Sequence, residues 1–374
     1  MEKLRVGVFF GGKSTEHEVS IKSATSVVCN LDYSKYDVLL VGVSREGHFF
    51  FGERAIQWKL PSACGLLDEL RRKGIKTVPS DADWVPEVMN EGIASVIDVA
   101  FPVFHGEFGE DGAIQGLFEY FGVPFVGASV LGSSIGIDKD VTKRLLRDAC
   151  ITTAKHMAFY RHENLDIEYE KISMHLGETL FVKPASRGSS IGVRKVHTKE
   201  AFDDAVINAF QYDNKIVVEE FVKGREVECS VLGNEYAEVS LPGEIVVNHE
   251  FYSYAAKYLD ENAANLKIPA DLPQNVMDNI RRIATQAYKV LCCEGMARVD
   301  FFVRDDGEVC LNEINTIPGF TREVSLYPKL WEATGLPYKD LLDRLIELAL
   351  FRHKRENRLS HQYLGTVPSQ EAVA

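Results

Sequence analysis

Apolar runs alternate with helix-spaced apolar positions along the first third of the chain. Residues 4–10, 36–44 and 96–104 are apolar runs of strand length, whereas residues 18–31 and 113–122 carry apolar side chains at helical spacing. Strands that alternate with helices in this way are typical of a parallel sheet covered by helices. We therefore expect an α/β protein that begins with a parallel α/β domain.

Two further units and a tail follow this domain. Residues 140–149 and 198–212 have helical spacing between short apolar runs, and a threonine opens the second of these helices. A strand at residues 224–233 and a helix at residues 272–291 belong to the third unit, and the polar end of the chain, from residue 353, shows no clear period. The expected division is an N-terminal domain 1–126, a central domain 127–221, a C-terminal domain 222–356 and a flexible tail 357–374.

A β-hairpin near the end of the third unit carries polar side chains on its strands. With a two-residue Asp-Gly turn at 306–307, Asp300 lies opposite Glu313 and Arg298 opposite Asn315, all on one face. Like charges directly opposite each other are destabilising, so a divalent cation such as Mg²⁺ would compensate. A solvated face with Arg298 as counter-ion is the alternative, and a three-residue turn would shift the register and weaken the metal hypothesis.

Composition narrows the classes of function. The 374 residues have a formal net charge of -13, which disfavours a general nucleic-acid or anionic-membrane binder. No apolar run is long enough to cross a bilayer, and the first residues lack the pattern of a signal peptide. The seven cysteines are scattered without metal-ligand spacing, as expected of free thiols in a reducing cytoplasm.

A Gly/Ser-rich loop at residues 183–193 lies between two expected strands. Its backbone N–H groups and hydroxyls could lie against phosphate oxygens, with Lys183 as a fixed positive charge. It is not a Walker loop, because GxxxxGK[ST] is absent, nor a dinucleotide fingerprint, because it stands between strands. A glycine hairpin without function is the alternative.

The strand end and helix start at residues 8–20 place Glu16 beside a Gly-Gly turn. Thr15 and Glu18 have the spacing of a capping box around this helix start. The Glu16 carboxylate could either stabilise the helix through its dipole or bind the ammonium group of a substrate.

Other candidates lie in loops and at the joins between units. His105 follows a buried strand and could donate to a carboxylate, and Lys139 opens a helix, where a cation hints at an anionic partner. Glu219 and Glu226 flank the join between the second and third units, where ligand pockets are common. A structural histidine, a solvated lysine and ordinary surface acids are the alternatives.

Two later loops could complete a site. Residues 249–258 form a long loop of the kind that closes over ligands, and Lys257 and Tyr258 could exclude water from a reactive intermediate. Residues 315–328 follow the hairpin and offer backbone N–H groups and hydroxyls that could hold a developing oxyanion.

Six motifs, in order, resemble those of the D-alanine–D-alanine ligases, a family of ATP-grasp ligases. They are GGKSTEHEVS, FHGEFGEDGAIQG, KPASRGSSIG, GREVECSVLGN, FYSYAAKY and LNEINTIPGFT, and the resemblance extends over residues 5–353. It implies a three-domain ATP-grasp fold and a cytoplasmic, homodimeric enzyme of peptidoglycan precursor synthesis. The implied reaction joins two D-Ala molecules through an acyl phosphate made from ATP.

The resemblance also implies roles for individual residues. ATP would be contacted by Lys139, Lys183, Ser190, Glu219, Glu226 and Lys257. Two Mg²⁺ ions, or Mn²⁺ in their place, would be held by Asp300, Glu313 and Asn315. Arg298 and the Gly319 N–H would stabilise the tetrahedral oxyanion. Glu16, with His105, would hold the first D-Ala. Ser189 and Tyr258 would link the Gly/Ser loop and the lid to Glu16. The second D-Ala would lie near Ser325 and Leu326.

Two departures from the family pattern concern the second substrate. The lid reads SYAAKY, where many relatives have acidic residues at Ser253 and Ala256, yet Lys257 and Tyr258 remain. The segment TREVSLYP is one residue longer than usual, which affects the positions matched to the second-substrate pocket. A ligase that uses D-Ser or D-lactate, and a non-catalytic nucleotide-binding module, remain the alternatives.

Overall fold

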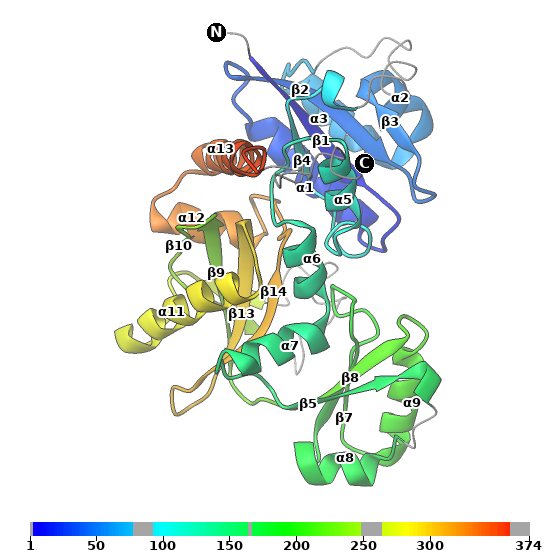
Figure 1. The fold of residues 1–374 in the computed structure, drawn as a ribbon, viewed down its shortest axis with the longest axis vertical. Helices are drawn as coiled ribbons and strands as arrows, with labels where there is room; N and C mark the ends of the chain where they lie inside the picture. Colours follow the sequence, from blue (N-terminus) through cyan, green and yellow to red (C-terminus); the bar gives the residue numbers. More distant parts are fainter. Residues whose placement is uncertain (1–2, 78–92, 164–166, 248–263, 360–374) are drawn as a thin grey trace, which may run out of the picture.

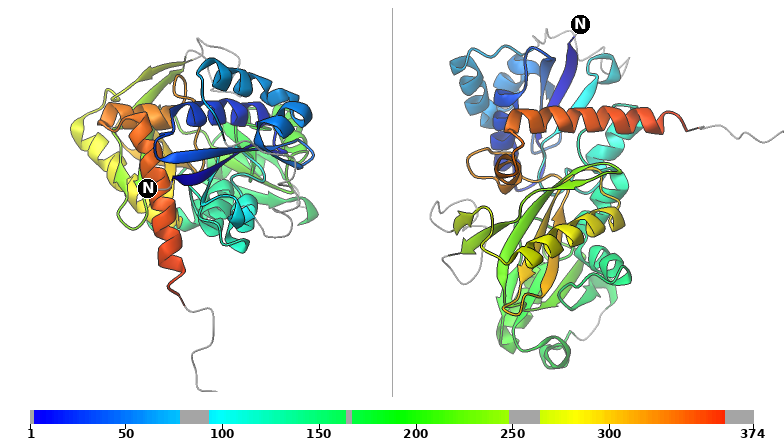
Figure 2. Two further views of the ribbon diagram at one scale, coloured as in Figure 1. Left: turned by 90° about the horizontal axis from the view of Figure 1, so that it is seen from above. Right: turned by 90° about the vertical axis from the view of Figure 1, so that its left-hand side faces the viewer.

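Three sheet-containing units lie along the long axis of the molecule, as the computed structural model shows (Figures 1 and 2). The structure describes residues 3–77, 93–163, 167–247 and 264–359. In Figure 1 the N-terminal unit is at the top, the unit with β9 and β13 is in the middle, and the unit with β5 and β8 is at the bottom. Within these ranges, no helix is both long and apolar enough to cross a membrane.

The N-terminal unit is built on a sheet of order β3-β2-β1-β4. Strand β1 is parallel to β2 and β4, as the alternating pattern predicted, whereas the short edge strand β3 is antiparallel to β2. Its strands are β1 Leu4–Gly11, β2 Tyr36–Val43, β3 Phe49–Phe51 and β4 Val99–Pro102. Its helices are α1 His17–Asn30, α2 Gly52–Lys59, α3 Cys64–Arg72 and α5 Ala113–Tyr120, with 3₁₀ turns at Pro61–Ala63 and Ile93–Ser95.

The second unit has an antiparallel sheet of order β5-β8-β6-β7. Thr198 caps the helix that follows β7 by accepting from the Ala201 N–H, which confirms the predicted threonine cap. The strands are β5 His156–Tyr160, β6 Leu180–Pro184, β7 Arg194–Val196 and β8 Lys215–Glu220. The helices are α8 Tyr169–Leu176 and α9 Lys199–Ala209, with a 3₁₀ turn at Arg161–Glu163. Helices α6 Val130–Ile137 and α7 Lys139–Asp148, which precede β5, pack instead against the unit with β9 and β13.

The third unit has a larger antiparallel sheet of order β12-β11-β9-β13-β14, and β10 pairs with β9. Helix α11 is amphipathic and buries one face against this sheet. The strands are β9 Arg225–Gly233, β10 Glu238–Val239, β11 Gly243–Val247, β12 Ala264–Lys267, β13 Gly295–Val303 and β14 Val309–Asn315. The helices are α11 Gln274–Val290, α12 Leu326–Thr334 and α13 Tyr338–Glu356.

Helix α13 ties the end of the chain to the N-terminal unit. Leu341 and Leu345 share one apolar core with Val27 of α1, and the buried Arg352 donates to the Phe125 carbonyl at 2.8 Å. The contact lies beside the predicted boundary at residue 126. The domain limits at 126, 221 and 356 themselves stay a prediction.

The predicted hairpin forms, but its turn is different. The loop has three residues, because the Arg304 N–H donates to the Glu308 carbonyl and Val303 pairs with Val309. A β-bulge in which the chain skips Asn312 then shifts the register back by one residue. The two-residue turn was therefore wrong, although the pairing it was used to predict is present.

Two further local predictions were wrong. Thr15 and Glu18 do not form a capping box, because α1 begins at His17 and the Glu16 N–H donates to the Ser14 hydroxyl instead. The expected loop at residues 249–258 lies outside the described residues, and strand β12, which pairs with β11, begins after it at Ala264. The polar end of the chain is helical to Glu356 rather than frayed from residue 353.

Candidate active site

A cleft of about 390 Å³ separates the sheet of the second unit from the sheet of the third. Strands β6 and β8 supply one wall, and β9, β13 and β14 supply the other. The predicted site residues that line it are Lys139, Lys183, Ser189, Ser190, Glu219, Glu226, Asp300 and Glu313. The cleft therefore brings together residues that the sequence places far apart, while Lys257 and Tyr258 lie outside the described residues.

One wall of the cleft carries an excess of buried positive charge. Lys183 Nζ lies 2.8 Å from Glu219 Oε2, and Lys143 Nζ lies 3.4 Å from the other oxygen of the same carboxylate. Burial opposes ionisation of Glu219, but the charges of Lys143 and Lys183 outweigh it and lower the pKa of this carboxyl to about 2. Two ammonium groups on one carboxylate leave positive charge for an anionic ligand. Lys143 was missed in the sequence because it reads as an ordinary helix lysine.

Lys139 reaches the cleft from the first turn of α7. Its Nζ donates to the Arg187 carbonyl at 2.7 Å, and its backbone N–H donates to the Ala185 carbonyl at 2.9 Å. Burial lowers the pKa of the Lys139 ammonium. Because both bonds end in the loop between β6 and β7, Lys139 is positioned together with that loop.

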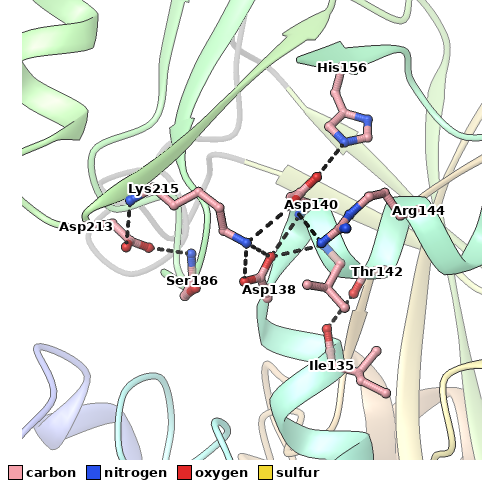
Figure 3. Close-up of polar contacts among 10 residues, drawn as sticks. Ile135, Asp138, Asp140, Thr142, Arg144, His156, Ser186, Asp213 and Lys215 are labelled. Carbon is pink, nitrogen blue, oxygen red and sulfur yellow. Dashed lines mark hydrogen bonds and ion pairs between the residues drawn. The ribbon is translucent and has the colours of Figure 1, made fainter. Parts of the chain in front are cut away.

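Figure 3 shows how the start of α7 is held in place. Asp138 caps the helix by accepting from the backbone N–H groups of Asp140 and Val141. Lys215, at the start of β8, reaches across to Asp138 at 2.6 Å and to Asp140 at 3.3 Å. This ion-pair cluster joins α7 to β8 directly behind the Gly/Ser loop. It gives a physical reason why Lys139 and Lys183, on different elements, face one cleft.

Two serines in the Gly/Ser loop adopt the left-handed region. The φ angles are 50° at Ser189 and 58° at Ser190, which is uncommon for residues with a side chain and often accompanies a functional constraint. The Ser189 hydroxyl donates to Glu16 Oε1. A Cβ at Gly188 would lie 3.2 Å from Glu16 Oε2, and one at Gly106 would lie 2.8 Å from it. Glu16 therefore sits between two loops that approach closely because glycines line them.

His105 lies in the buried interior next to this corner. Its Nδ1 is 3.1 Å from the Ile317 carbonyl and its Nε2 is 3.0 Å from the Ser23 hydroxyl. Burial lowers the pKa of the imidazole, which favours the neutral ring. A carbonyl can only accept, so Nδ1 donates to Ile317 and Nε2 accepts from Ser23. Donation from His105 to a substrate carboxylate stays a prediction and requires one of these bonds to change.

Glu110 is a buried residue of this corner that the sequence reasoning missed. Its two oxygens accept from the backbone N–H of Gly106 at 2.6 Å and of Ile317 at 3.3 Å. Burial, together with the charge of Glu16, raises the pKa of Glu110 to about 8. The signal was the motif GEDG, whose first acid follows a buried strand in the same Gly-rich segment as His105. Glu110 ties the loop of His105 to the loop after β14.

Replacing Glu110 with Gln is expected to change the pH dependence of stability. The folded-state pKa lies above the ordinary value of 4.5, so the folded chain binds more protons between pH 4.5 and 8 and loses stability as the pH rises through this window. The contribution is roughly 4 kcal/mol. Urea unfolding at pH 5 and pH 8 measures it: the parent should lose more stability than the variant. An equal loss in both would contradict the assignment, and the exposed Glu119→Gln should behave like the parent.

The paired hairpin face is present as predicted. Asp300 pairs with Glu313, and Arg298 pairs with Asn315. Arg298 donates to both oxygens of Asp300 at 2.7 Å, and the Asn315 amide donates to Asp300 Oδ2 at 3.0 Å. The like charges of the two acids are thus offset by one guanidinium and one amide.

The chemistry of this face fits Mg²⁺ bound together with phosphate. Mg²⁺ usually takes one or two carboxylates plus phosphate oxygens and water, rather than a cage of protein ligands. Asp300 and Glu313 supply two carboxylates at the open cleft, and Asn315 supplies an amide oxygen if its side chain turns. Across the described ranges, no group of three or more His, Cys, Asp or Glu side chains is arranged to enclose a metal ion.

The residues matched to the second substrate lie after the hairpin. Ser325 precedes α12, and its hydroxyl accepts from the Thr321 N–H at 3.0 Å. A Cβ at Gly319 would lie 2.6 Å from the same hydroxyl oxygen, so only glycine fits there without a shift. The side chain of Leu326 packs with Ile245 in a small apolar core. The Leu326 side chain is therefore engaged in this core, and a ligand beside it would contact the backbone of residue 326 instead.

Both the sequence and the structure of this chain are similar to those of known proteins. The family model described as D-ala D-ala ligase N-terminus matches residues 5–128, and D-ala D-ala ligase C-terminus matches residues 145–347. A D-alanine--D-alanine ligase of Shouchella clausii (strain KSM-K16) is 48% identical over 362 residues, covering 96% of this chain and 98% of the relative. D-alanine--D-alanine ligase A of Escherichia coli (strain K12) is 46% identical over 370 residues, covering 96% and 99%.

Solved structures agree with the sequence matches. The D-alanine-D-alanine ligase from Coxiella burnetii superposes with a TM-score of 0.78 at 37% identity and covers 95% of this chain and 98% of its own. The VanG D-Ala:D-Ser ligase from Enterococcus faecalis superposes with a TM-score of 0.77 at 33% identity, covering 93% and 100%. The predicted three-part ATP-grasp architecture is confirmed by these superpositions. The chain belongs to the D-alanine–D-alanine ligase family.

Proposed function

We propose that this protein joins two D-Ala molecules to D-alanyl-D-alanine with ATP, which becomes ADP and phosphate, to supply peptidoglycan precursor synthesis. The observation that carries the proposal is the cleft with lysines on one wall and paired carboxylates on the other. Such a cleft suits a triphosphate, because ammonium groups and metal ions neutralise different phosphate oxygens. A ligase needs this arrangement, whereas a non-catalytic nucleotide-binding module does not need the acidic pair.

The first chemical step makes the carboxylate of D-Ala reactive. One carboxylate oxygen bonds to the γ-phosphorus while the bond between that phosphorus and ADP breaks, which gives an acyl phosphate. Lys139 and Lys183 would hold the phosphates, with Ser190 as a hydroxyl donor, and Glu226 would bind the ribose. Asp300, Glu313 and Asn315 would hold the Mg²⁺ that neutralises charge on the transferred group. That two ions bind, and that Mn²⁺ can replace them, is part of the proposal.

The second step forms the peptide bond. The amine of the second D-Ala attacks the acyl carbon, its nitrogen loses a proton, and the tetrahedral oxyanion collapses as phosphate leaves and takes up that proton. Arg298 and the Gly319 N–H would stabilise the oxyanion, since preorganised donors act where charge develops. Glu16 would hold the ammonium group of the first D-Ala, and its contact with Ser189 would place that group near the phosphate loop.

D-Ser is the second candidate for the second substrate. The superposed VanG protein is a D-Ala:D-Ser ligase, and it is 33% identical to this chain. Replacement of a methyl by a hydroxymethyl group adds little bulk, so the pocket near Ser325 and Leu326 decides between the two amino acids. We also propose that the protein is a cytoplasmic homodimer, which light scattering on the purified protein would test.

Phosphate release with identification of the product by mass tests the proposal. Purified protein would receive ATP, Mg²⁺ and either D-Ala, L-Ala, D-Ala with D-Ser, D-Ala with D-lactate, or no amino acid. We expect release with D-Ala and a D-alanyl-D-alanine product, without turnover on L-Ala. If a mixed product exceeds D-alanyl-D-alanine, the preferred second substrate is D-Ser or D-lactate rather than D-Ala. If no mixture releases phosphate, the ligase assignment is contradicted.

A further inference from the structure

A third acid, which the family comparison does not assign, stands beside the paired carboxylates. Strand β9 pairs with β13 so that Glu228 lies directly opposite Asp300, which in turn lies opposite Glu313 on β14. The three acids therefore form a row across three neighbouring strands, and all three line the cleft. Glu228 is 7% exposed and Asp300 is 8% exposed, so neither charge is well solvated.

Arg298 lies between Glu228 and Asp300. Its Nε is 2.8 Å from Glu228 Oε2 and 2.7 Å from Asp300 Oδ1. The single N–H of Nε is donated to Asp300, and Nη2 binds the second oxygen of Asp300 at 2.7 Å. Glu228 is thus already within ion-pair distance of the guanidinium, while the Nε and Nη2 hydrogen bonds go to Asp300.

In this arrangement Arg298 competes with a metal ion for Asp300. Both oxygens of Asp300 accept from Arg298, and Asn315 also donates to Oδ2. A divalent cation placed on the same carboxylate would meet the positive guanidinium at close range. Charge repulsion between the metal ion and Arg298 therefore favours release of Asp300 by Arg298, and a buried guanidinium without a carboxylate would cost several kcal/mol.

We propose that Glu228 is a positioning residue that receives Arg298 when Asp300 turns to the metal ion. Only a small rotation separates the two arrangements, because Nε lies almost equally far from the two acids. Glu228 keeps the guanidinium charged, buried and close to the site where the oxyanion forms. The inference rests on the proposed function, in which Asp300 binds Mg²⁺ and Arg298 serves the second step.

Without Glu228, Arg298 keeps its hydrogen bonds to Asp300 and competes with the metal ion. We expect Glu228→Gln to weaken binding of Mn²⁺ in the presence of ADP by about ten- to hundredfold, the usual effect of losing a group that orients a metal ligand. Electron paramagnetic resonance of free Mn²⁺, measured without D-Ala, reads this affinity without turnover. Glu228→Asp, which retains the charge, should recover part of the affinity.

Simple loss of a negative charge near the metal is the competing explanation, and a double-mutant cycle separates the two. If Glu228 acts through Arg298, Glu228→Gln should weaken Mn²⁺ binding strongly in the parent but less than about threefold in Arg298→Met, where Asp300 has no competitor. Equal weakening in both backgrounds, or none in the parent, would overturn the proposal. Glu244→Gln is the matched control, because Glu244 is a buried acid of the same cleft that pairs with Arg225 instead.

The outcome remains separable from that of the ligase assignment. Product formation by the parent protein with D-Ala is measured independently of Mn²⁺ binding. If the double-mutant cycle shows coupling between Glu228 and Arg298 but no ligation product forms, the movement of Arg298 from Asp300 to Glu228 is supported and the proposed ligation is contradicted. Circular dichroism of each variant establishes that it is folded, and Glu228→Asp supplies the test if Glu228→Gln does not fold.

Discussion

Glu313→Gln is expected to lower kcat by about a hundredfold or more while the fold stays intact. The amide keeps the shape of the side chain but loses the charge that lies opposite Asp300, and metal binding is worth several kcal/mol of charge stabilisation in phosphoryl transfer. Removing one of two like charges also relieves repulsion across the strands, so stability should be equal or higher. Steady-state phosphate release over a range of Mg²⁺ concentrations, together with thermal unfolding, measures both effects.

The same hairpin offers a matched control. Glu308 lies at the turn, is 49% exposed in its side chain and pairs with Arg304. Glu308→Gln should leave kcat within a factor of two of the parent. If Glu313→Gln retained the parent kcat at every Mg²⁺ concentration, the metal role of the hairpin face would be wrong.

Glu219→Gln is expected to lower the free energy of unfolding by about 3–5 kcal/mol at pH 7. The substitution leaves Lys143 and Lys183 buried beside a neutral amide, with two charges no longer compensated. ATP binding should weaken as well, since Lys183 loses the partner that fixes its position. Urea unfolding measures the first effect, and Glu238→Gln, which removes an exposed ion pair with Arg344, should cost less than about 1 kcal/mol.

The pH dependence gives this prediction a second readout. The folded-state pKa of Glu219 is lowered from 4.5 to about 2, so its stabilisation is fully present above pH 4.5 and is lost as the pH falls towards 2. The difference in stability between parent and Glu219→Gln should therefore shrink between pH 5 and pH 3. A difference that stays constant over this range would contradict the ionised, lysine-bound carboxylate.

The hairpin shows what local pattern can and cannot predict. Alternation along each strand places Arg298 and Asp300 on one face without any knowledge of the rest of the chain. The turn length and the bulge at Asn312 depend on how the whole sheet twists and closes, so the sequence offered no signal for either. The three-residue turn and the bulge shift the register in opposite directions, so the predicted pairing is present.

The cleft itself required motifs from distant parts of the chain. Lys183 and its Gly/Ser loop could be identified locally. Only the tertiary structure brings Lys143 to Glu219, and Glu228 to Arg298. Buried charges of this kind look like surface charges in a sequence, because composition does not reveal burial. Glu110 was missed for the same reason, since its two backbone partners come from loops more than two hundred residues apart.

The most direct test of the account follows oxygen atoms through the reaction. D-Ala labelled with ¹⁸O in its carboxylate would be incubated with the protein, ATP and Mg²⁺, and the phosphate released would be analysed by mass. Ligation through an acyl phosphate transfers one carboxylate oxygen to the phosphate, so each phosphate should carry one ¹⁸O atom alongside the D-alanyl-D-alanine product. Unlabelled phosphate would contradict the acyl phosphate, and labelled D-Ala left unjoined, without phosphate release, would contradict ligation itself.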